Sequence, residues 1–245
     1  MGLTSAIRIA IVRFYSFFST DKKRSKVIFY HDIHDGRKYT TMSTAVELFE
    51  HHIKIIRENG YEIVSEITHP VGQIEICFDD GFLGLYDNIE LIKRLNIPMH
   101  LFVVSSFLGK EKYMNQKQLL ELNDLEHIKI SSHTHTHKLL SQISEKEVEN
   151  ELKESKEVLE DITSKKVDSI CYPEGKFNSR VIEIATALGY NKLYSSIPGF
   201  YTDEFAKNVK KRSLVQFAEE KELKAILRGG DHILAFWYKL KHFRK

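Results

Sequence analysis

Two adjacent carboxylates at the end of an apolar run are the residues of this sequence best suited to chemistry. The run from Ile74 to Phe78 leads directly into Asp79 and Asp80, and Gly81 interrupts it. Short apolar runs that end in glycine are typical of buried strands. Two like charges side by side at the end of such a strand are costly. This cost favours a functional pair over the alternative, a solvated acidic turn.

A histidine cluster follows a later apolar run, with the sequence His-Thr-His-Thr-His at positions 133–137. The spacing of His133 and His137 places both imidazoles on one side of a helical turn or tight loop. Two histidines and one carboxylate leave coordination positions open for water and substrate, and Asp80 is the natural third ligand. For the spacing alone, the alternative is a hydrogen-bonded histidine pair without a metal. The histidine spacing together with the two carboxylates predicts one bound divalent ion, with zinc preferred. His135 lies between the two ligands and is expected to pack or to support the loop.

A metal held in this way predicts hydrolysis at an acyl carbon. The ion lowers the pKa of bound water to about 7 and polarises a carbonyl oxygen. Asp79 is then available to accept the proton of that water. The rigid turn formed by Pro173, Glu174 and Gly175 is expected to direct backbone N–H groups at a developing oxyanion, and Tyr172, Pro173 and Glu174 are the candidate substrate and oxyanion residues.

The departing amine must also be protonated, and His31 is the candidate acid. It follows the apolar run 26–30, and imidazole titrates near neutral pH. His34, further out in a loop next to Gly36, is the alternative donor. The other alternative is that His31 only hydrogen-bonds the rim of the fold.

Strands and helices alternate along the chain, which predicts a mainly parallel sheet in an α/β fold. The strands are expected at 26–30, 61–64, 74–80, 98–104, 128–131, 167–172, 192–195 and 212–217. The helices are expected at 44–59, 85–95, 116–122, 144–162, 179–188, 219–227 and 233–243. Seven or eight strands favour a (β/α) barrel, in which the carboxyl ends of the strands carry the chemistry. All the candidate site residues follow such ends.

The composition is that of an ordinary soluble globular protein. The chain has 245 residues, of which 42% are hydrophobic and 29% charged. A net charge of +2 gives no reason to expect a nucleic acid partner. Cys77 and Cys171 lie in apolar runs and are expected to be buried thiols in a reducing compartment, not a disulfide. The expected organisation is an amphipathic extension over 1–25 and one catalytic domain over 26–245.

Residues 5–19 are rich in apolar side chains but carry Arg8 and Arg13. They show neither the uninterrupted apolar core nor the cleavage site of a secretory signal, and they are too short and too charged for a membrane span. An amphipathic helix packed on the domain is expected, and a membrane-surface helix is the alternative. We therefore expect a cytoplasmic protein, with peripheral membrane contact through this helix as the variant.

The motifs resemble those of a known family. Phe78-Asp79-Asp80-Gly81 is similar to the first motif of the polysaccharide deacetylases, the NodB-homology domain of carbohydrate esterase family 4. Positions 133–137 match the second motif, His-Thr-x-x-His, and 172–175 resemble the third, so that the resemblance covers residues 26–217. The order of these segments is similar to the family branch with an N-terminal extension. The resemblance implies a distorted (β/α) barrel and a divalent metal. It implies removal of N-acetyl groups, sometimes O-acetyl groups, from sugars. It also implies these roles: Asp79 as base, Asp80, His133 and His137 as ligands, and Thr134 as a support of the loop.

The sequence departs from the family pattern at three points. Cys171 occupies the position of the arginine that often precedes the third-motif proline and orients the base. Glu174 replaces the common aromatic residue or glycine. No late strand ends in an acid-donating histidine, since His232 and His242 lie in helical surroundings. A metal-dependent sugar N-deacetylase is the leading hypothesis. The alternatives are a catalytically weak relative that binds a glycan or partner in the same cleft, and a metal amidohydrolase for a small amide.

Overall fold

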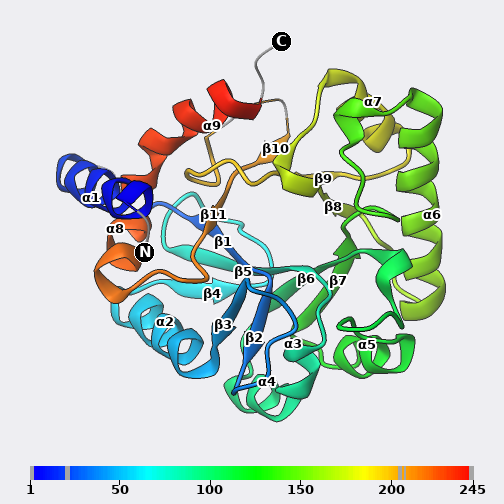
Figure 1. The fold of residues 1–245 in the computed structure, drawn as a ribbon, viewed down its shortest axis with the longest axis horizontal. Helices are drawn as coiled ribbons and strands as arrows, with labels where there is room; N and C mark the ends of the chain where they lie inside the picture. The colour runs from blue at the N-terminus through cyan, green and yellow to red at the C-terminus, as the bar shows by residue number, and fades with distance from the viewer. Residues whose placement is uncertain (1–2, 20–22, 204–205, 207, 243–245) are drawn as a thin grey trace.

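A parallel sheet forms the centre of the protein in a computed structural model that describes residues 3–19, 23–203, 206 and 208–242 (Figure 1). Within these residues the sheet has nine strands, in the order β10-β9-β8-β7-β6-β5-β1-β11 with β4 added beside β5, and the pairs are parallel. The bounds are β1 (Lys26–Tyr30), β4 (Glu62–Val64), β5 (Gln73–Asp80), β6 (Met99–Val103), β7 (Ile128–Ser132), β8 (Ser169–Cys171), β9 (Lys192–Tyr194), β10 (Val209–Lys210) and β11 (Arg212–Leu214). The expected α/β fold with a parallel sheet is confirmed.

Helices surround the sheet (Figure 1). The α-helices are α1 (Leu3–Phe18), α2 (Val46–Glu58), α3 (Gly84–Asp87), α4 (Ile89–Leu95), α5 (Gln116–Asn123), α6 (Glu145–Thr163), α7 (Ser179–Ala187), α8 (Glu220–Leu227) and α9 (Leu234–His242). The 3-10 turns are η1 (Ser105–Phe107), η2 (Leu140–Gln142), η3 (Pro173–Gly175) and η4 (Gly230–Ile233). α6 begins with the capping box that its sequence predicts, in which the side chains of Ser144 and Glu147 each accept from the other residue's backbone N–H.

Side-chain alternation along the strands separates two regions of the core. On β5, Ile74, Ile76 and Phe78 belong to the large apolar cluster packed under the helices. Cys77 belongs to a smaller cluster on the opposite face of the sheet, inside its curve. Both faces of β5 are buried: its helix-side face is apolar, whereas its inner face also carries the polar side chains of Gln73 and Glu75. Asp79 has the same parity as Cys77, so it faces the inside of the sheet at its carboxyl end.

The sheet stays open between its two end strands. β10 pairs with β9 at one end and β11 pairs with β1 at the other, although only Lys211 separates β10 from β11 in the chain. The backbone N–H of Arg212 donates to the carbonyl of Ile197 across the opening, at 2.9 Å. We call this opening the seam. Over the described residues, no strand pairing joins β10 to β11, so the expected barrel is not closed by strand-to-strand hydrogen bonds.

Several details differ from the sequence-based expectation. The helix expected at 85–95 is divided at Asn88 into α3 and α4. The short pair β2 (Asp32–His34) and β3 (Ser43–Ala45), and the two-residue β10, were not anticipated, because such short strands carry no periodic signal.

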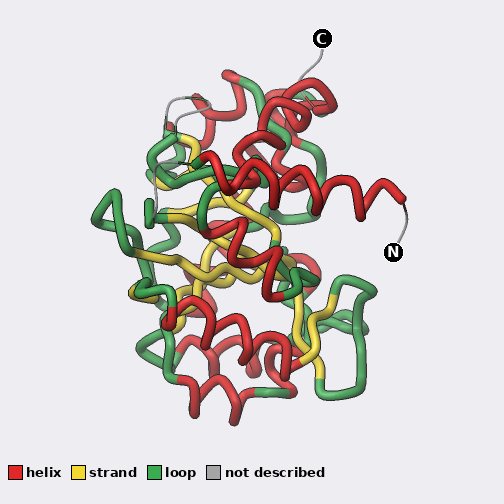
Figure 2. Tube along the Cα trace, turned by 90° about the vertical axis from the view of Figure 1, so that its left-hand side faces the viewer, coloured by secondary structure: helices red, strands yellow, loops and turns green. Residues whose placement is uncertain are grey.

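The N-terminal helix α1 packs on α8 and η4, and part of it extends past the body of the molecule (Figure 2). In the described part of the chain, no helix has both the length and the apolar character needed to cross a membrane. Residues 1–2 and 20–22 of the expected extension lie outside the description.

Candidate functional site

Three side chains from two strand ends form the candidate metal centre. Asp80 ends β5, whereas His133 and His137 lie in the loop after β7. Asp80 Oδ1 lies 3.5 Å from His133 Nε2 and 3.5 Å from His137 Nε2. That oxygen is buried and has no hydrogen-bond partner among the described residues. Ligand atoms about 2.1 Å from a tetrahedral zinc ion are about 3.4 Å apart, so the donor set fits a divalent ion, as predicted from the motifs.

The protonation of His133 also suits a ligand. Its Nδ1 lies 2.7 Å from the carbonyl oxygen of Cys171, which can only accept, so Nδ1 carries the hydrogen and Nε2 presents its lone pair toward Asp80. Burial lowers the pKa of His133 to about 4, which keeps the imidazole neutral at pH 7. A neutral imidazole whose outer N–H is held by a carbonyl is the usual form of a metal-bound histidine.

Some of the strained backbone positions of the chain lie at this site. Asp80, Thr134 and His137 have positive φ angles of 73°, 67° and 63°. Residues other than glycine rarely adopt this backbone conformation. The loop is held by its own hydroxyls: Ser132 Oγ accepts from the Thr134 N–H, and Thr134 Oγ1 accepts from the His137 N–H at 3.0 Å. Strain of this kind persists where the surroundings enforce it, and it is common at functional sites.

Asp79 is held by an arginine that the motifs do not contain. Arg212 Nη1 and Nη2 each donate to one Asp79 oxygen at 2.7 Å, and both side chains are almost fully buried. Burial alone raises the pKa of Asp79, but the charge and hydrogen bonds of Arg212 outweigh it and hold that pKa at about 2. Asp79 is therefore a carboxylate at neutral pH, adjacent to the metal ligands, with its orientation fixed by a bidentate pair.

His31 directly follows β1, which pairs with β5 in parallel, so it lies at the same mouth as Asp79. Its Nδ1 is 2.7 Å from Gln216 Oε1. If the amide oxygen accepts there, Nδ1 carries the hydrogen and Nε2 is left for a substrate. The backbone carbonyl of Gln216 accepts a hydrogen bond from Thr44 Oγ1 at 2.8 Å. His34, the alternative donor, accepts from the backbone N–H of Gly36 through its Nδ1.

The third motif forms the turn η3. The Tyr172 side chain is buried on the helix side of the sheet, beside Phe177, so it faces away from the mouth. The N–H groups of Tyr172, Gly175 and Lys176 donate to the carbonyls of Tyr194, Tyr172 and Pro173, respectively. The half-exposed Glu174 side chain pairs with Lys176 at 2.8 Å. An oxyanion role for Tyr172, Pro173 and Glu174 stays a prediction, and the N–H groups of Tyr172, Gly175 and Lys176 already donate to backbone carbonyls.

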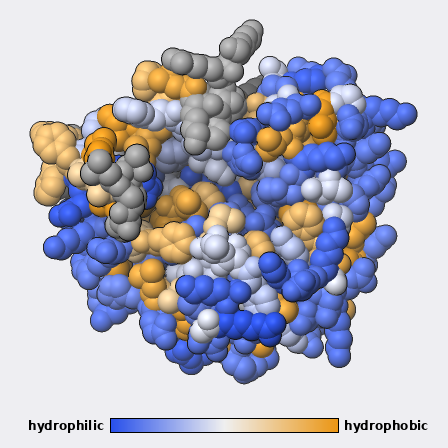
Figure 3. All heavy atoms as spheres, in the orientation of Figure 1, coloured by the Kyte–Doolittle hydropathy of each residue, from blue (hydrophilic) through white to orange (hydrophobic). Residues whose placement is uncertain are grey.

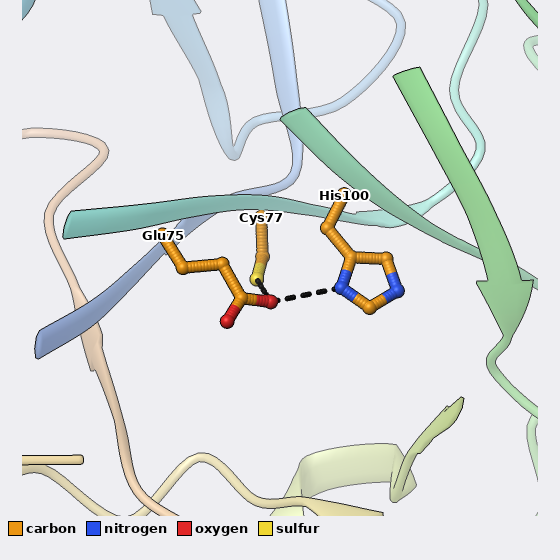
Figure 4. A group of neighbouring side chains, drawn as sticks. All are labelled: Glu75, Cys77 and His100. Carbon is orange, nitrogen blue, oxygen red and sulfur yellow. Dashed lines mark hydrogen bonds and ion pairs between the residues drawn. The ribbon is translucent and has the colours of Figure 1, made fainter. Parts of the chain in front are cut away.

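Below this mouth, the inside of the sheet holds a polar group formed by Glu75, Cys77 and His100 (Figure 4). Glu75 Oε1 contacts His100 Nδ1 at 2.9 Å and accepts from the Tyr194 hydroxyl at 3.0 Å. The second nitrogen of His100 contacts Ser131 Oγ at 2.7 Å. Because these side chains are fully buried and already paired with one another, they form a hydrogen-bonded floor under the site and not a second metal centre.

The cysteines have the expected state. Cys77 and Cys171 are buried free thiols, and burial raises the pKa of both. Cys171 lies beside Asp79 and His133, but its thiol stays protonated and Asp79 is committed to Arg212. These three residues are therefore a poor ligand set.

Comparison with known proteins shows the family of the chain. The family model described as "Polysaccharide deacetylase" matches residues 66–193, which contain the three motifs. The chain is similar to YxkH of Bacillus subtilis (strain 168), a protein that carries the name of a polysaccharide deacetylase, with 25% identity over 185 residues. That match covers 71% of this chain and 64% of YxkH.

Solved structures show the same fold. The Streptococcus pyogenes deacetylase PplD, in complex with acetate, matches with a TM-score of 0.74 and 18% identity over 84% of this chain and 99% of PplD. BC0361, a polysaccharide deacetylase from Bacillus cereus, matches with a TM-score of 0.72 and 22% identity over 84% of this chain and 69% of BC0361. With the family model covering just over half of the residues and the motifs assembled at one mouth, the chain belongs to the polysaccharide deacetylase family.

Proposed function

We propose that this protein is a metal-dependent hydrolase that removes N-acetyl groups from an acetylated aminosugar or glycan. The observation that carries the proposal is the buried, unpartnered oxygen of Asp80 between the imidazoles of His133 and His137. Family membership supports a deacetylase acting on a carbohydrate. Imidazole and carboxylate donors favour zinc.

The residues of the chain divide the work. Asp80, His133 and His137 would hold the ion. A bound divalent ion would polarise the acyl oxygen and make its water a stronger acid. Asp79, kept ionised by Arg212, accepts the proton of the attacking water. His31, through the nitrogen that does not face Gln216, gives a proton to the departing amine.

Arg212 also bears on the alternative of a catalytically weak binding protein. That alternative was motivated partly by the missing third-motif arginine. Arg212, on β11, supplies a guanidinium to the same carboxylate from another part of the chain. The arrangement therefore favours an enzyme over a binding relative.

Metal analysis combined with an assay on N-acetylated aminosugars tests the proposal. The parent is expected to contain about one zinc ion and to release acetate. The double variant His133→Ala/His137→Ala should lose the metal, whereas Asp79→Asn should keep it and lose turnover at least about a hundredfold. Asp124→Asn, which changes an exposed carboxyl at the end of α5, is the matched control. Stoichiometric metal in the double variant, or parental turnover in Asp79→Asn, would refute the assignment.

A further inference from the structure

An apolar pocket of about 580 Å³ lies at the seam, where the sheet is open. We call it the seam pocket. Its lining includes Arg8, Phe29, Ser196, Leu214, Leu234 and Trp237. They come from α1, β1, the loop after β9, β11 and α9, so the pocket lies between the open edge of the sheet and the two terminal helices.

The seam pocket adjoins the site. The ring of Phe29 in its wall lies 4.3 Å from the guanidinium carbon of Arg212, the residue that holds Asp79. The same ring lies 5.8 Å from the ring of His31. Across the pocket, the Tyr238 hydroxyl on α9 donates to the carbonyl of Glu174 in the third motif. A ligand in the pocket would therefore lie next to the mouth where, by the proposed function, the acetyl group is removed.

The outer rim continues into an exposed apolar surface on α1 and α9, which Figure 3 shows toward the upper left. We call it the terminal-helix face. It is formed by Ile7, Ile11, Phe14, Tyr15, Phe17 and Phe18 of α1 with Phe236, Trp237 and Leu240 of α9. Patches this rich in exposed aromatic residues on a soluble domain mark interaction sites.

Charge on α1 indicates what covers this face. Arg8 lies at the pocket rim and stays half-exposed although it pairs with Glu222 at 3.0 Å, and Arg13 is also exposed on the same helix. A helix that interleaves aromatic residues with arginine is typical of segments that lie in the headgroup region of anionic membranes.

We propose that the seam pocket binds the hydrocarbon chain of a lipid-linked acetylated aminosugar while the terminal-helix face lies on an anionic membrane surface. Arg8 would then meet the anionic group that joins lipid to sugar. This inference rests on the proposed deacetylase function and names the class of its substrate. Each methylene group buried in such a pocket improves affinity about fourfold. The length of the hydrocarbon chain, and not only the sugar, would therefore set the Michaelis constant.

The protein carries its own reporter, since Trp237 in the pocket wall is its one tryptophan. A dodecyl N-acetylglucosaminide, kept below its micelle concentration, should shift the Trp237 emission to shorter wavelength in a saturable way, and the methyl glycoside should not. The KM of the enzyme should be at least tenfold lower for the dodecyl than for the methyl substrate. Leu214→Phe, which fills the pocket, should weaken dodecyl binding at least tenfold; Leu120→Phe, at an equally exposed leucine on α5, should not.

These measurements separate the inference from the function it rests on. Equal KM values with no Trp237 response would overturn the pocket assignment while leaving the deacetylase standing. A saturable response that Leu214→Phe removes, without turnover of either substrate, would support the pocket and overturn the deacetylase.

Vesicles test the terminal-helix face. The protein should sediment with vesicles containing phosphatidylglycerol, and Phe14→Ser/Phe17→Ser should reduce the bound fraction at least tenfold. The membrane proposal is wrong if the parent does not sediment with the vesicles and is a dimer in solution, whereas the double variant is a monomer. The face would then be an interface between two copies of the chain.

Discussion

Asp79 is a buried charge and Phe17 is an exposed apolar side chain, and both arrangements are unfavourable in free energy. The protein compensates only the first of them. Asp79 is a carboxylate with 3% of its surface exposed, and Arg212 compensates its charge from within the chain. Phe17 is an aromatic side chain with 77% exposure, and nothing among the described residues covers it. The charge of Asp79 is thus compensated within the chain, whereas the apolar surface of Phe17 stays exposed in the described structure. This difference suits the roles proposed above, proton transfer at Asp79 and membrane binding at the terminal-helix face.

The largest expected effect comes from breaking the pair at the mouth. Arg212→Met should cost about 3–5 kcal/mol of unfolding free energy, because it leaves a buried carboxylate without its counter-charge. It should also reduce deacetylation at least about a hundredfold, since Asp79 loses its orientation. Denaturant unfolding and acetate release measure the two effects.

A double variant and a surface pair sharpen this prediction. Asp79→Asn/Arg212→Met should recover part of the lost stability but none of the activity, because it removes both buried charges. Arg180→Met, which breaks exposed pairs with Glu145 and Glu183, should change stability by about 1 kcal/mol or less. If Arg212→Met and Arg180→Met lower the free energy of unfolding equally, the buried Asp79–Arg212 pair contributes no more to stability than an exposed ion pair.

A smaller loss is expected at His31. His31→Ala should lower turnover at least about tenfold with unchanged metal content, because it removes the proposed proton donor but no ligand. Gln216→Leu should give a weaker loss, since the imidazole then lacks the partner that fixes its tautomer. His34→Ala is the matched control. If His34→Ala loses more activity than His31→Ala, the proton donor is His34.

The grouping of Asp80 with His133 and His137 could be predicted from the sequence because these residues lie at strand ends or just after them, and parallel strands bring such ends to one mouth. The sequence does not predict Arg212 as the partner of Asp79, because β11 follows the motifs late in the chain and takes its place beside β1 only through the topology of the sheet. One signal was present: an arginine in an expected buried strand needs a counter-charge. His31 and Arg212 both lie outside the matched segment 66–193.

The smallest expected effect concerns the terminal-helix face itself. Phe17→Ser should change the free energy of unfolding by no more than about 0.5 kcal/mol, because an exposed side chain gains nothing from folding and serine and phenylalanine have similar helix propensities. On the same helix, Val12 is buried against the domain, and Val12→Ala should cost about 1.5 kcal/mol for the two carbons removed. Chemical denaturation measures both. A cost at Phe17 equal to that at Val12 would show that the face already packs inside the chain, and the contrast with the mouth would then disappear.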